Sequence, residues 1–475
     1  MRLDRLADGL AGNVPEVAVT GFAIDNRKVA PGCVFGAFEG ARVNGEDFIP
    51  QAVAAGAVAV VARPEAKVEG VFHVESNNPR RLFARMAAQF YAPFPDTCVA
   101  VTGTNGKTST VELTRQIWRA LGHKSASIGT LGVTTSVDQV STGLTTPDIV
   151  TFLSNMAGLK KEGITHAAFE ASSHGLAQYR TEGLPVIAGA FTNLSRDHLD
   201  YHGDMESYYA AKMRLFDEVI VDDGAAVIWA DDARSADVIA RASARGLRLV
   251  TVGEGGETLR LVSRAPTALG QKLVIAADGV EHSIDLPLIG AYQAANVLIS
   301  AGLVLACGTP WGQIMPHLSR LQPVRGRLER AVLNKTGAPV YVDYAHTPDG
   351  LRAAIEALRP HTKGRLIVLF GAGGDRDAGK RPLMGKVAAE LADHVIVTDD
   401  NPRSEDPTVI RAAIMAGAPG AQEIGGRRAA IAAAIAQAGP QDIVLLAGKG
   451  HEQGQIIGER VLPFDDVEVA RECAQ

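Results

Sequence analysis

The stretch Val-Ala-Val-Thr-Gly-Thr-Asn-Gly-Lys-Thr-Ser-Thr at residues 99–110 constrains the fold of this chain more than any other. An apolar run from Cys98 to Val101 predicts a buried strand, and two glycines, Gly103 and Gly106, follow it directly. A helix is predicted to begin near Lys107, because apolar residues then recur with helical spacing. A strand, a glycine turn and a helix N-terminus in this order form a cradle for an anion.

This turn predicts a site for the phosphates of a nucleotide. Lys107 is placed to neutralise the β- and γ-phosphates, and Thr108 can offer its hydroxyl to Mg²⁺. The match to a general phosphate loop is incomplete, since the glycine expected five positions before the Gly-Lys pair is Val101 here. An ordinary strand–helix turn does not explain why Gly-Lys-Thr stands at the first helical turn, so we favour the phosphate site.

Length and composition limit the class of protein. A chain of 475 residues is too long for one core, so we expect two or three domains. The net charge of −6 speaks against a nucleic-acid surface. The four scattered cysteines form no metal-binding or disulfide pattern, which is typical of a reducing compartment. We see neither the apolar core of a signal peptide nor a long uncharged apolar run, and therefore expect a cytoplasmic protein.

Apolar runs and helical patterns divide the chain into three predicted domains, 1–90, 91–322 and 323–475. The first has β-like runs at 17–20, 34–37, 58–61 and 71–74 and a helical patch at 50–55. The second has strands at 166–169, 186–191 and 225–229, a more polar β-like region at 259–288 that interrupts them, and a helix at 292–307. The alternation of strands and helices predicts a parallel, doubly wound sheet.

The third predicted domain restarts this alternation after Pro323. Its predicted strands lie at 340–342, 366–370, 394–398 and 443–446, and its predicted helices at 349–358, 380–391 and 409–416. The fold class is therefore α/β throughout. We expect a small α/β domain, a central P-loop-like doubly wound domain and a C-terminal Rossmann-like domain.

Polar residues follow two predicted strands of the second domain, at the edge where parallel sheets bind ligands. The strand at 166–169 ends in Glu170, a carboxylate in the same sheet as the phosphate loop and therefore placed to hold Mg²⁺. The strand at 186–191 leads into a loop that concentrates Asp197, His198 and His202. One histidine is more often structural than a ligand, but a cluster directly after a strand favours a site.

Lys212 interrupts the apolar face of a predicted helix at 204–219, four residues after Tyr208. A buried ammonium group is costly unless it is paired or shifted towards the neutral amine. The pattern alone favours a snorkelling lysine whose amine reaches water. The alternative is a neutral Lys212 that adds CO₂ and becomes a carbamate, an anionic oxygen ligand for Mg²⁺. The residues leave both interpretations open.

Four loops of the third domain each follow a predicted strand and are rich in Arg, Asp, Asn and His. They begin at Asp343, Gly371, Asp399 and Gly448. Strand-to-helix loops are normally polar, so each loop alone is a weak signal. Together they predict a site for a small charged or zwitterionic ligand, in which Arg403 can bind a carboxylate through two hydrogen bonds.

These stretches, in this order, resemble the Mur ligase family of peptidoglycan synthesis, and the resemblance covers nearly the whole chain. It is strongest with members that add a diamino acid to UDP-N-acetylmuramoyl-L-alanyl-D-glutamate. The motifs that carry it are Asp25-Asn-Arg-Lys-Val-Ala-Pro-Gly, Thr102-Gly-Thr-Asn-Gly-Lys-Thr, Leu144-Thr-Thr-Pro, Glu170-Ala-Ser-Ser-His, Asp197-His-Leu-Asp, the Ala-Lys212 helix, Gly326-Arg-Leu-Glu, Asp343-Tyr-Ala-His, Gly373-Gly-Asp-Arg-Asp and Gly448-Lys-Gly-His-Glu.

The resemblance implies a role for each domain. The first domain is expected to hold the UDP end of the substrate near Asn26 and Asn44. Residues implied to contact the muramoyl dipeptide are Thr145, Thr146, Ser172, Gln178 and Arg180. Residues implied to bind ATP are Gly103, Thr104, Asn105, Gly106, Lys107, Thr108, Ser109, Asn296, Arg327 and Asp343.

The resemblance also bears on the metal and on the amino acid. Family members carry a carbamylated lysine at the position of Lys212, and Mg²⁺ is implied to be bound by Thr108, Glu170, His198 and this carbamate. The sequence Asp400-Asn-Pro-Arg is similar to the form that selects meso-diaminopimelate, since relatives that add lysine lack the arginine. Residues implied to surround diaminopimelate are Arg376, Asn401, Arg403, Gly448 and Glu452.

The implied activity is ATP-dependent amide formation. The γ-carboxylate of D-glutamate forms an acyl phosphate, and the amine of diaminopimelate then displaces phosphate, with Lys107, Lys212 and His198 as catalytic residues. No nucleic-acid or membrane partner is implied, and we expect a monomer. A lysine-adding ligase and a folylpolyglutamate synthetase are alternative functions, and a nucleotide-binding regulator without catalysis is an alternative of another class.

Some positions depart from the family pattern. Asn26 replaces a common serine, and Asn44 and Glu46 stand where Asp and His are frequent. Gln293 replaces an asparagine and Ala372 a cysteine. These departures concern the UDP contacts most. The phosphate, metal and Arg403 positions keep the family residues.

Overall fold

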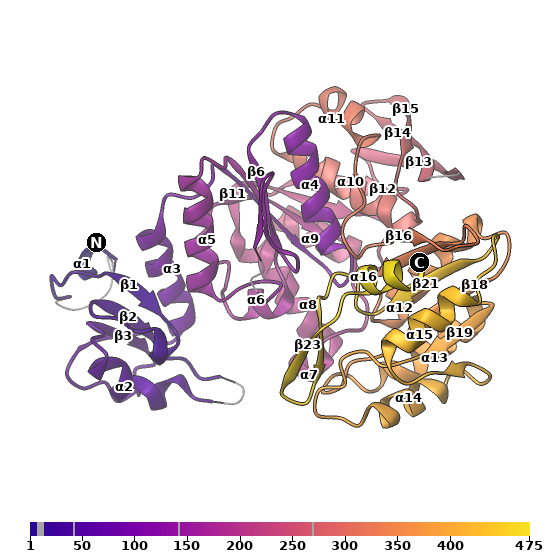
Figure 1. Ribbon diagram of the computed structural model, residues 1–475. Coiled ribbons are helices and arrows are strands. Elements are labelled where there is room, and N and C mark those ends of the chain that lie inside the picture. Colours follow the sequence, from indigo (N-terminus) through magenta and orange to yellow (C-terminus); the bar gives the residue numbers. More distant parts are fainter. Residues whose placement is uncertain (7–13, 41–42, 141–142, 268–269) are drawn as a thin grey trace.

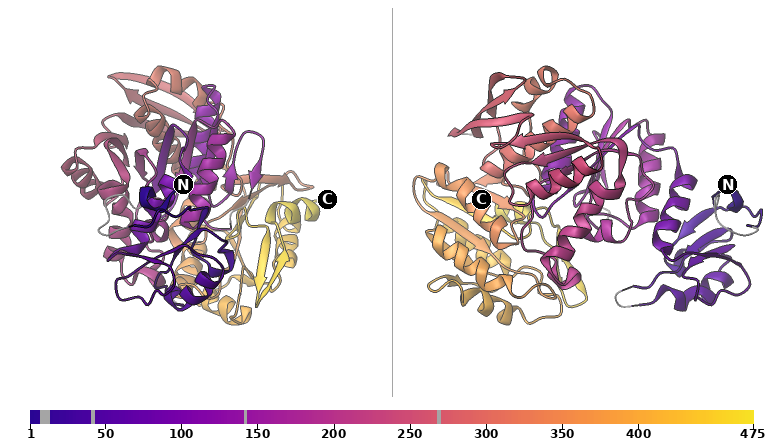
Figure 2. Two further views of the ribbon diagram at one scale, coloured as in Figure 1. Left: turned by 90° about the vertical axis from the view of Figure 1, so that its left-hand side faces the viewer. Right: turned by 180° about the vertical axis from the view of Figure 1, so that it is seen from behind.

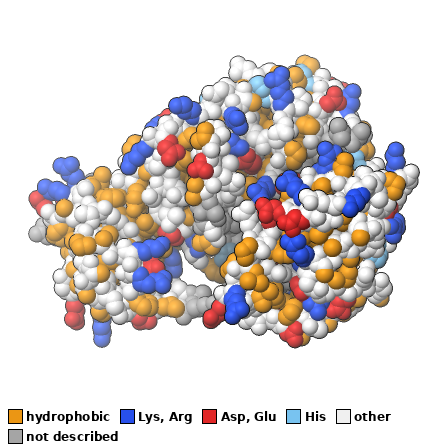
Figure 3. All heavy atoms as spheres, in the orientation of Figure 1, with side chains coloured by type: hydrophobic (Ala, Val, Ile, Leu, Met, Phe, Trp, Pro, Cys, Tyr) orange, Lys and Arg blue, Asp and Glu red, His pale blue; other side chains and the backbone are white. Residues whose placement is uncertain are grey.

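The computed structural model describes residues 1–6, 14–40, 43–140, 143–267 and 270–475, which form three α/β domains. Figure 1 shows the N-terminal domain at the left, the central domain above and the C-terminal domain at the lower right. In Figure 2, the view from behind also shows the two outer domains separated from each other. In Figure 3 the surface is hollowed between the outer domains, below the central one. Within the described residues, no helix is both long and apolar enough to cross a bilayer.

The N-terminal domain is built on a parallel sheet in the order β1-β2-β3-β4. Successive side chains of β3 enter different cores, because Val60 packs towards α2 whereas Val61 packs towards α3. The elements are α1 (Leu3–Leu6), β1 (Gly21–Ala23), η1 (Asn26–Lys28), β2 (Cys33–Gly36), η2 (Gly45–Phe48), α2 (Ile49–Ala54), β3 (Ala59–Ala62), β4 (Phe72–Glu75) and α3 (Pro79–Tyr91).

One predicted strand of this domain is wrong. The segment 17–20 does not join the sheet, and the first strand is β1, a few residues later. The reason is that this segment pairs with the chain's first residues: the Leu3 amide donates to the Val17 carbonyl (2.9 Å), and the Val19 amide donates to the Met1 carbonyl (2.7 Å). The polar loop after Glu39 contains η2, and its residues 41 and 42 lie outside the described part of the chain.

The central domain has an eleven-stranded sheet in the order β15-β14-β13-β12-β11-β10-β5-β9-β6-β7-β8. Its elements are β5 (Thr97–Thr102), α4 (Lys107–Ala120), β6 (Ser125–Gly129), β7 (Gly132–Thr134), β8 (Gln139–Val140), α5 (Ile149–Lys161), β9 (His166–Glu170), α6 (Ser173–Ala177), β10 (Val186–Phe191), α7 (Leu199–His202), α8 (Met205–Arg214), the π-helix η3 (Leu215–Val219), β11 (Ile220–Trp229), α9 (Ser235–Ala244), β12 (Arg248–Gly253), β13 (Leu259–Thr267), β14 (Gly270–Ala277), β15 (Val280–Leu286), α10 (Ala291–Ala306) and α11 (Trp311–Leu318).

Both faces of this sheet are covered, as predicted for a doubly wound fold. Along β5, Cys98 and Ala100 pack on the face that carries α5 and α8, whereas Val99 and Val101 pack on the face that carries α4 and α10. The strands from β12 to β6 are parallel. The polar region at 259–288 does not interrupt the sheet. It extends one edge with β13, β14 and β15, which are paired antiparallel to one another.

The C-terminal domain has a six-stranded sheet in the order β16-β17-β21-β18-β19-β20, parallel except for β16. The elements are β16 (Glu329–Leu333), β17 (Pro339–Asp343), α12 (Pro348–Leu358), η4 (Arg359–His361), β18 (Leu366–Phe370), α13 (Lys380–Leu391), β19 (His394–Val397), α14 (Pro407–Met415), β20 (Gln422–Glu423), α15 (Arg427–Ala436), β21 (Ile443–Ala447), β22 (Gly454–Ile457), β23 (Arg460–Pro463) and α16 (Asp466–Cys473). The predicted strands and helices are confirmed. The sequence did not predict β16, β20, α15, α16 or the hairpin β22–β23.

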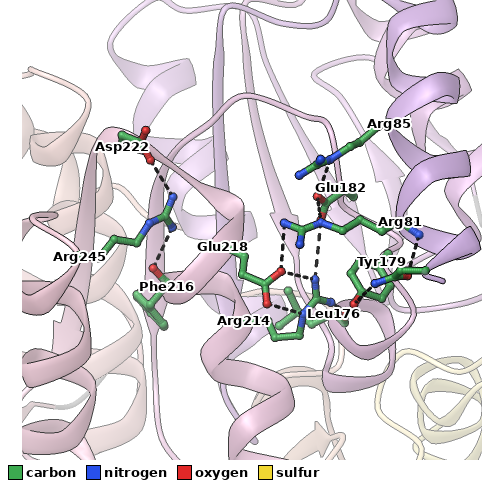
Figure 4. A network of polar contacts seen from close by, with 11 residues as sticks. Arg81, Arg85, Leu176, Tyr179, Glu182, Arg214, Phe216, Glu218, Asp222 and Arg245 are labelled. Carbon is green, nitrogen blue, oxygen red and sulfur yellow. Dashed lines mark hydrogen bonds and ion pairs between the residues drawn. The ribbon is translucent and has the colours of Figure 1, made fainter. Parts of the chain in front are cut away.

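The N-terminal and central domains are joined by a network of ion pairs (Figure 4). Glu182, 6% exposed, accepts a hydrogen bond from Arg81 of α3 (2.8 Å) and another from Arg85 (3.2 Å). Arg214 of α8 lies 3.7 Å from the same carboxylate and stacks on the Tyr179 ring. A single buried carboxylate is therefore compensated by cations from both domains.

We expect Glu182→Gln to lower the thermal unfolding temperature, because three arginines lose their shared anion. The free energy of unfolding should fall by about 2 kcal/mol. This is less than for a fully buried pair, because Arg81 and Arg85 are partly exposed. Circular dichroism melting measures the change. Glu472→Gln, which breaks the exposed pair with Arg428, is the matched control and should leave the melting temperature unchanged. Equal melting curves for both variants would contradict the role of Glu182.

Candidate active site

The phosphate loop between β5 and α4 leaves no room for side chains at its glycines. A Cβ atom on Gly103, which has φ +144°, would lie 1.9 Å from the Thr192 hydroxyl oxygen. A Cβ atom on Gly106, with φ +88°, would lie 2.4 Å from Asn296 Oδ1. Glycine is required at both positions for steric reasons, and it keeps the backbone of the loop open towards a ligand.

Lys107 and Lys212 converge on this loop from different helices. The Lys107 ammonium donates to the carbonyls of Gly103 (2.9 Å) and Thr104 (2.8 Å). Lys212 Nζ, on α8, donates to the same Gly103 carbonyl at 2.7 Å and lies 4.2 Å from the centre of the Tyr208 ring. Two lysines thus share one carbonyl oxygen.

The snorkelling interpretation of Lys212 is wrong. The residue is 1% exposed, so its amine does not reach water. Burial lowers the pKa of Lys212 well below its usual range, and the charge of Lys107 lowers it further. The helix pattern suggested a lysine at the edge of an apolar stripe with its amine in water, but the phosphate loop covers this amine. A neutral amine at this position is the form that can react with CO₂.

Glu170 and His198 lie at the same cavity, as the sheet order implies. Glu170 ends β9 beside the phosphate strand, and its carboxylate accepts from the Thr130 amide (2.7 Å) and hydroxyl (3.2 Å). His198 has a left-handed backbone, and its Nε2 lies 3.4 Å from Asp197 Oδ2. Burial lowers the pKa of His198 to about 3, so its imidazole is neutral and free to act as a ligand.

The predicted metal ligands are not assembled into a compact group. Within the described residues, no three His, Cys, Asp or Glu side chains come together as a metal site. The Thr108 hydroxyl accepts a hydrogen bond from Arg327 (2.9 Å), a residue of the C-terminal domain. Mg²⁺ is usually held by one or two carboxylates together with substrate phosphates and water. Glu170 beside a phosphate loop fits that mode of binding.

A cavity of about 530 Å³ is lined by Lys107, Thr108, Glu170, His198 and Lys212. It is also lined by Asn296 of α10 and by Arg327 and Asp343, the three residues predicted to contact adenosine. Asp343 accepts from the Leu328 amide (2.7 Å) and the Tyr292 hydroxyl (3.2 Å). The Arg327 guanidinium lies 4.4 Å from the centre of the Tyr344 ring. This cavity lies between the central and C-terminal domains.

A second cavity, of about 790 Å³, lies at the carboxyl ends of the C-terminal strands. The four polar loops converge there as predicted, since each contributes lining residues. The predicted amino-acid residues that line it are Arg376, Asn401, Arg403, Gly448 and Glu452. Arg403 has a left-handed backbone, and its Nη1 donates to the Gly374 carbonyl at 2.8 Å.

The two cavities adjoin. Residues that line both of them come from the central and C-terminal domains, and they are Thr130, Thr145, Asp197, His198, Tyr344 and His346. Asp197 lies within 4.0 Å of His346 Nε2. A group bound at the phosphate loop and a group bound at Arg403 therefore face a common wall.

The predicted dipeptide residues form a cluster beside this wall. Arg180 donates to the carbonyl of Thr146 (2.7 Å) and to the side-chain oxygen of Gln178 (2.7 Å). Thr146 in turn donates to Ser172 Oγ at 3.0 Å. Thr145, the neighbour of Thr146, lines both cavities.

The structure does not bring every predicted residue to the cavities. Asn26 and Asn44 belong to the N-terminal domain, and within the described chain they line neither cavity. Asn44 accepts from the Glu46 amide at 3.1 Å and thereby caps η2. Their predicted contacts with UDP remain a prediction.

Comparison with known proteins agrees with this architecture. The Mur ligase family catalytic domain model matches residues 18–91, the Mur ligase middle domain model 101–304 and the Mur ligase glutamate ligase domain model 326–450. The chain belongs to the Mur ligase family. The resemblance seen in the motifs is thereby confirmed, as are the α/β class and the three-domain organisation of this Mur ligase.

Individual relatives are similar over most of their length. The UDP-N-acetylmuramoyl-L-alanyl-D-glutamate--2,6-diaminopimelate ligase of Zymomonas mobilis is 63% identical, covering 98% of this chain and 96% of the relative. A solved structure of a ligase with the same name is 32% identical, with a TM-score of 0.72 and coverage of 100% and 98%. Folylpolyglutamate synthase of Mycobacterium tuberculosis, complexed with ADP, shares the fold at 19% identity with a TM-score of 0.63 and covers 76% of this Mur ligase and 89% of itself.

Sequence reasoning missed several residues that line the cavities of this Mur ligase. Tyr292, at the start of α10, and Tyr344 flank the Asp343 and Arg327 side chains. Tyr344 could have been singled out because it directly follows Asp343 at the end of a strand. Lys449 lines neither cavity but is fully buried next to Gly448, which lines the second one, and its sequence context gives no sign of its contact with Asn401.

We expect Gly103→Ala to weaken ADP binding by at least ~10-fold, because the added Cβ displaces the loop from Thr192 and from its required φ. Isothermal titration calorimetry measures the dissociation constant. Gly158→Ala, in α5, is the control, since a Cβ there meets no atom within 4 Å. A folded Gly103→Ala protein with unchanged ADP affinity would contradict the assignment of this loop.

Proposed function

We propose that this Mur ligase joins meso-diaminopimelate to UDP-N-acetylmuramoyl-L-alanyl-D-glutamate with the energy of ATP, in the synthesis of the peptidoglycan precursor. The 63% identical relative carries the name of this activity. The observation that carries the proposal is the wall shared by a cavity with a phosphate loop and a cavity with Arg403. Transfer of an activated acyl group to an amine requires that the two groups are held close together, and adjoining cavities can hold them so.

The reaction has two steps. The γ-carboxylate of D-glutamate attacks the γ-phosphorus of ATP, the bond to the bridging oxygen breaks, and ADP leaves. The amine of diaminopimelate then attacks the carbonyl carbon of the acyl phosphate, loses a proton, and displaces inorganic phosphate. In this scheme Lys107 neutralises charge on the transferring group, and the loop from Gly103 to Ser109 holds the ATP phosphates.

The central domain offers donors that fit Mg²⁺ in the presence of nucleotide. Glu170 and the neutral His198 line the phosphate cavity, and Thr108 begins α4. Mg²⁺ bound here would offset the charge of the phosphates. We further propose that Lys212 is carbamylated. Its buried neutral amine can add CO₂ and lose a proton, and the resulting carbamate is an anion that can pair with both Lys107 and Mg²⁺.

The C-terminal domain is the proposed site of amino-acid selection. Arg403 lies with Arg376, Asn401, Gly448 and Glu452 around one cavity. Diaminopimelate differs from lysine by a second carboxylate, and a guanidinium group binds a carboxylate with two parallel hydrogen bonds. Arg403 therefore favours diaminopimelate over lysine, which is the closer of the alternative substrates.

We propose that the N-terminal domain binds the UDP end through Asn26 and Asn44. The dipeptide is proposed to bind to the central domain, at the cluster of Thr145, Thr146, Ser172, Gln178 and Arg180. We take 1–90, 91–322 and 323–475 as the three functional units.

A folylpolyglutamate synthetase needs no UDP-binding domain, and the synthase of known structure covers 76% of this chain. We also propose a cytoplasmic monomer, since both nucleotide substrates belong to that compartment and one chain carries every proposed site.

We expect the wild-type protein, given ATP and UDP-N-acetylmuramoyl-L-alanyl-D-glutamate, to release ADP and form tripeptide with diaminopimelate far better than with lysine. Arg403→Ala should lower kcat/KM for diaminopimelate by about 100-fold, the loss of a charge-assisted hydrogen-bond pair. Arg428→Ala, an exposed arginine of the same domain, is the control and should behave as wild type. Equal use of lysine and diaminopimelate by the wild-type protein would overturn the proposed selectivity.

We expect Lys212→Ala to lose activity that short carboxylic acids such as acetate partly restore, because a free carboxylate can occupy the space of the carbamate. Coupled assay of ADP release against acetate concentration measures the effect. Lys386→Ala, an exposed lysine, should neither lose activity nor respond to acetate. A folded but inactive Lys212→Ala protein that acetate does not activate would count against the carbamate.

A further inference from the structure

Lys449 is a fully buried lysine in the C-terminal domain, between Gly448 and Gly450. Its Nζ donates to the Gly454 carbonyl (2.6 Å), to Asn401 Oδ1 (3.1 Å) and to Glu452 Oε2 (3.1 Å). An ammonium group has three N–H donors, and three acceptors take them: Asn401 from one loop, and Glu452 and Gly454 from the segment that follows Lys449. The side chain therefore acts as a fixed three-way connection inside the fold.

Two of these three partners are residues of the proposed diaminopimelate site. Asn401 Nδ2 also donates to Glu452 Oε2 at 2.8 Å, so Lys449, Asn401 and Glu452 form a closed triangle of hydrogen bonds. The orientation of the Asn401 amide is fixed on both sides, because its Oδ1 accepts from the Ile456 amide as well (3.0 Å). Lys449 thus sets where both side chains present their polar atoms.

The third partner, Gly454, begins strand β22, which runs along the segment from Asp400 to Arg403. Gln455 donates to the Asp400 carbonyl (2.7 Å), and the Arg403 amide donates to the Ile456 carbonyl (3.0 Å). The Gly458 amide in turn donates to the Arg403 carbonyl at 2.7 Å. By holding the start of β22, Lys449 supports the strand that keeps Arg403 in its left-handed conformation.

The charge of Lys449 matters as well as its hydrogen bonds. Asp400 Oδ1 lies 3.6 Å from Nζ, so one cation faces the carboxylates of Asp400 and Glu452. Without it, a buried carboxylate, Asp400, and a partly exposed one, Glu452, would stand beside the place where a second substrate carboxylate has to bind. Neighbouring carboxylates repel one another strongly in a poorly solvated site.

We propose that Lys449 is a positioning residue that determines specificity for a doubly acidic amine. It orients Asn401, Glu452 and Arg403 and offsets the local negative charge, without touching the substrate itself. This inference rests on the proposed function and deepens it. It assigns part of the discrimination against lysine to a residue that is enclosed by the protein.

The test compares Lys449→Met, which keeps the length of the side chain and removes its charge, with wild type. We expect KM for diaminopimelate to rise about 10- to 100-fold, while KM for ATP and for the UDP substrate stays within about twofold. The ratio of kcat/KM for diaminopimelate over lysine should fall, because lysine has no second carboxylate to be repelled. Lys386→Met, an exposed lysine on α13, is the matched control and should leave every constant unchanged.

The outcomes separate this inference from the proposed function. Wild-type protein that forms no diaminopimelate product contradicts the proposed function before any variant is made. Normal wild-type activity together with an unchanged KM for diaminopimelate in folded Lys449→Met overturns the positioning role. An equal loss for all three substrates also overturns it, since that result indicates a structural role alone.

A second variant keeps the test decisive if Lys449→Met does not fold. Lys449→Arg retains the positive charge, but its longer planar group cannot meet the three acceptors at their present positions. We expect a raised KM for diaminopimelate with normal ADP affinity by calorimetry. A folded Lys449→Arg protein with wild-type KM and specificity ratio would overturn the inference.

Discussion

The carbonyl oxygen of Gly103 is the point on which the active site depends. Lys107 and Lys212 both donate to it, at 2.9 and 2.7 Å, from helices on opposite faces of the central sheet. Two ammonium groups that share one oxygen in a buried cavity repel each other, so the arrangement favours a neutral Lys212 or an added anion. ATP phosphates and a carbamate are anions of this kind. The two lysines therefore favour the binding of an anionic ligand at this loop.

Sheet topology explains why the proposed catalytic groups meet although they are far apart in sequence. Strands β9 and β10 lie on either side of β5, so Glu170, the loop after β10 and the phosphate loop emerge at one edge. The sequence predicted this meeting because strand ends in a parallel sheet share a direction. The same reasoning predicted the second cavity from four polar loops. The strands and helices that carry these loops were predicted to within a few residues.

Other features could not be predicted because they depend on distant contacts. Periodicity placed Lys212 on an apolar face, but only the packed structure shows that the phosphate loop covers its amine. The segment at 17–20 has a strand pattern and yet pairs with the first residues of the chain. The compensation of Lys449 includes Asn401, which is 48 residues away in sequence, and the local sequence does not reveal this partner. Tertiary partners, rather than propensity, decide each of these cases.

The contact between Arg327 and Thr108 connects the C-terminal domain with the phosphate loop. Arg327 follows the central domain in sequence, and its guanidinium donates to the hydroxyl that is predicted to face Mg²⁺. A guanidinium and a divalent cation repel each other at hydrogen-bond distance, so both cannot be partners of Thr108 at once. If Thr108 faces Mg²⁺ as predicted, a metal–nucleotide complex would replace Arg327 at the hydroxyl, and its phosphates and ribose would offer the guanidinium new acceptors. Leu328, the next residue, donates to Asp343 at 2.7 Å, so the segment that carries Arg327 is bonded to the first strand-to-helix loop of the C-terminal domain. Thr108 is thus connected through Arg327, Leu328 and Asp343 to Tyr344, which lines both cavities.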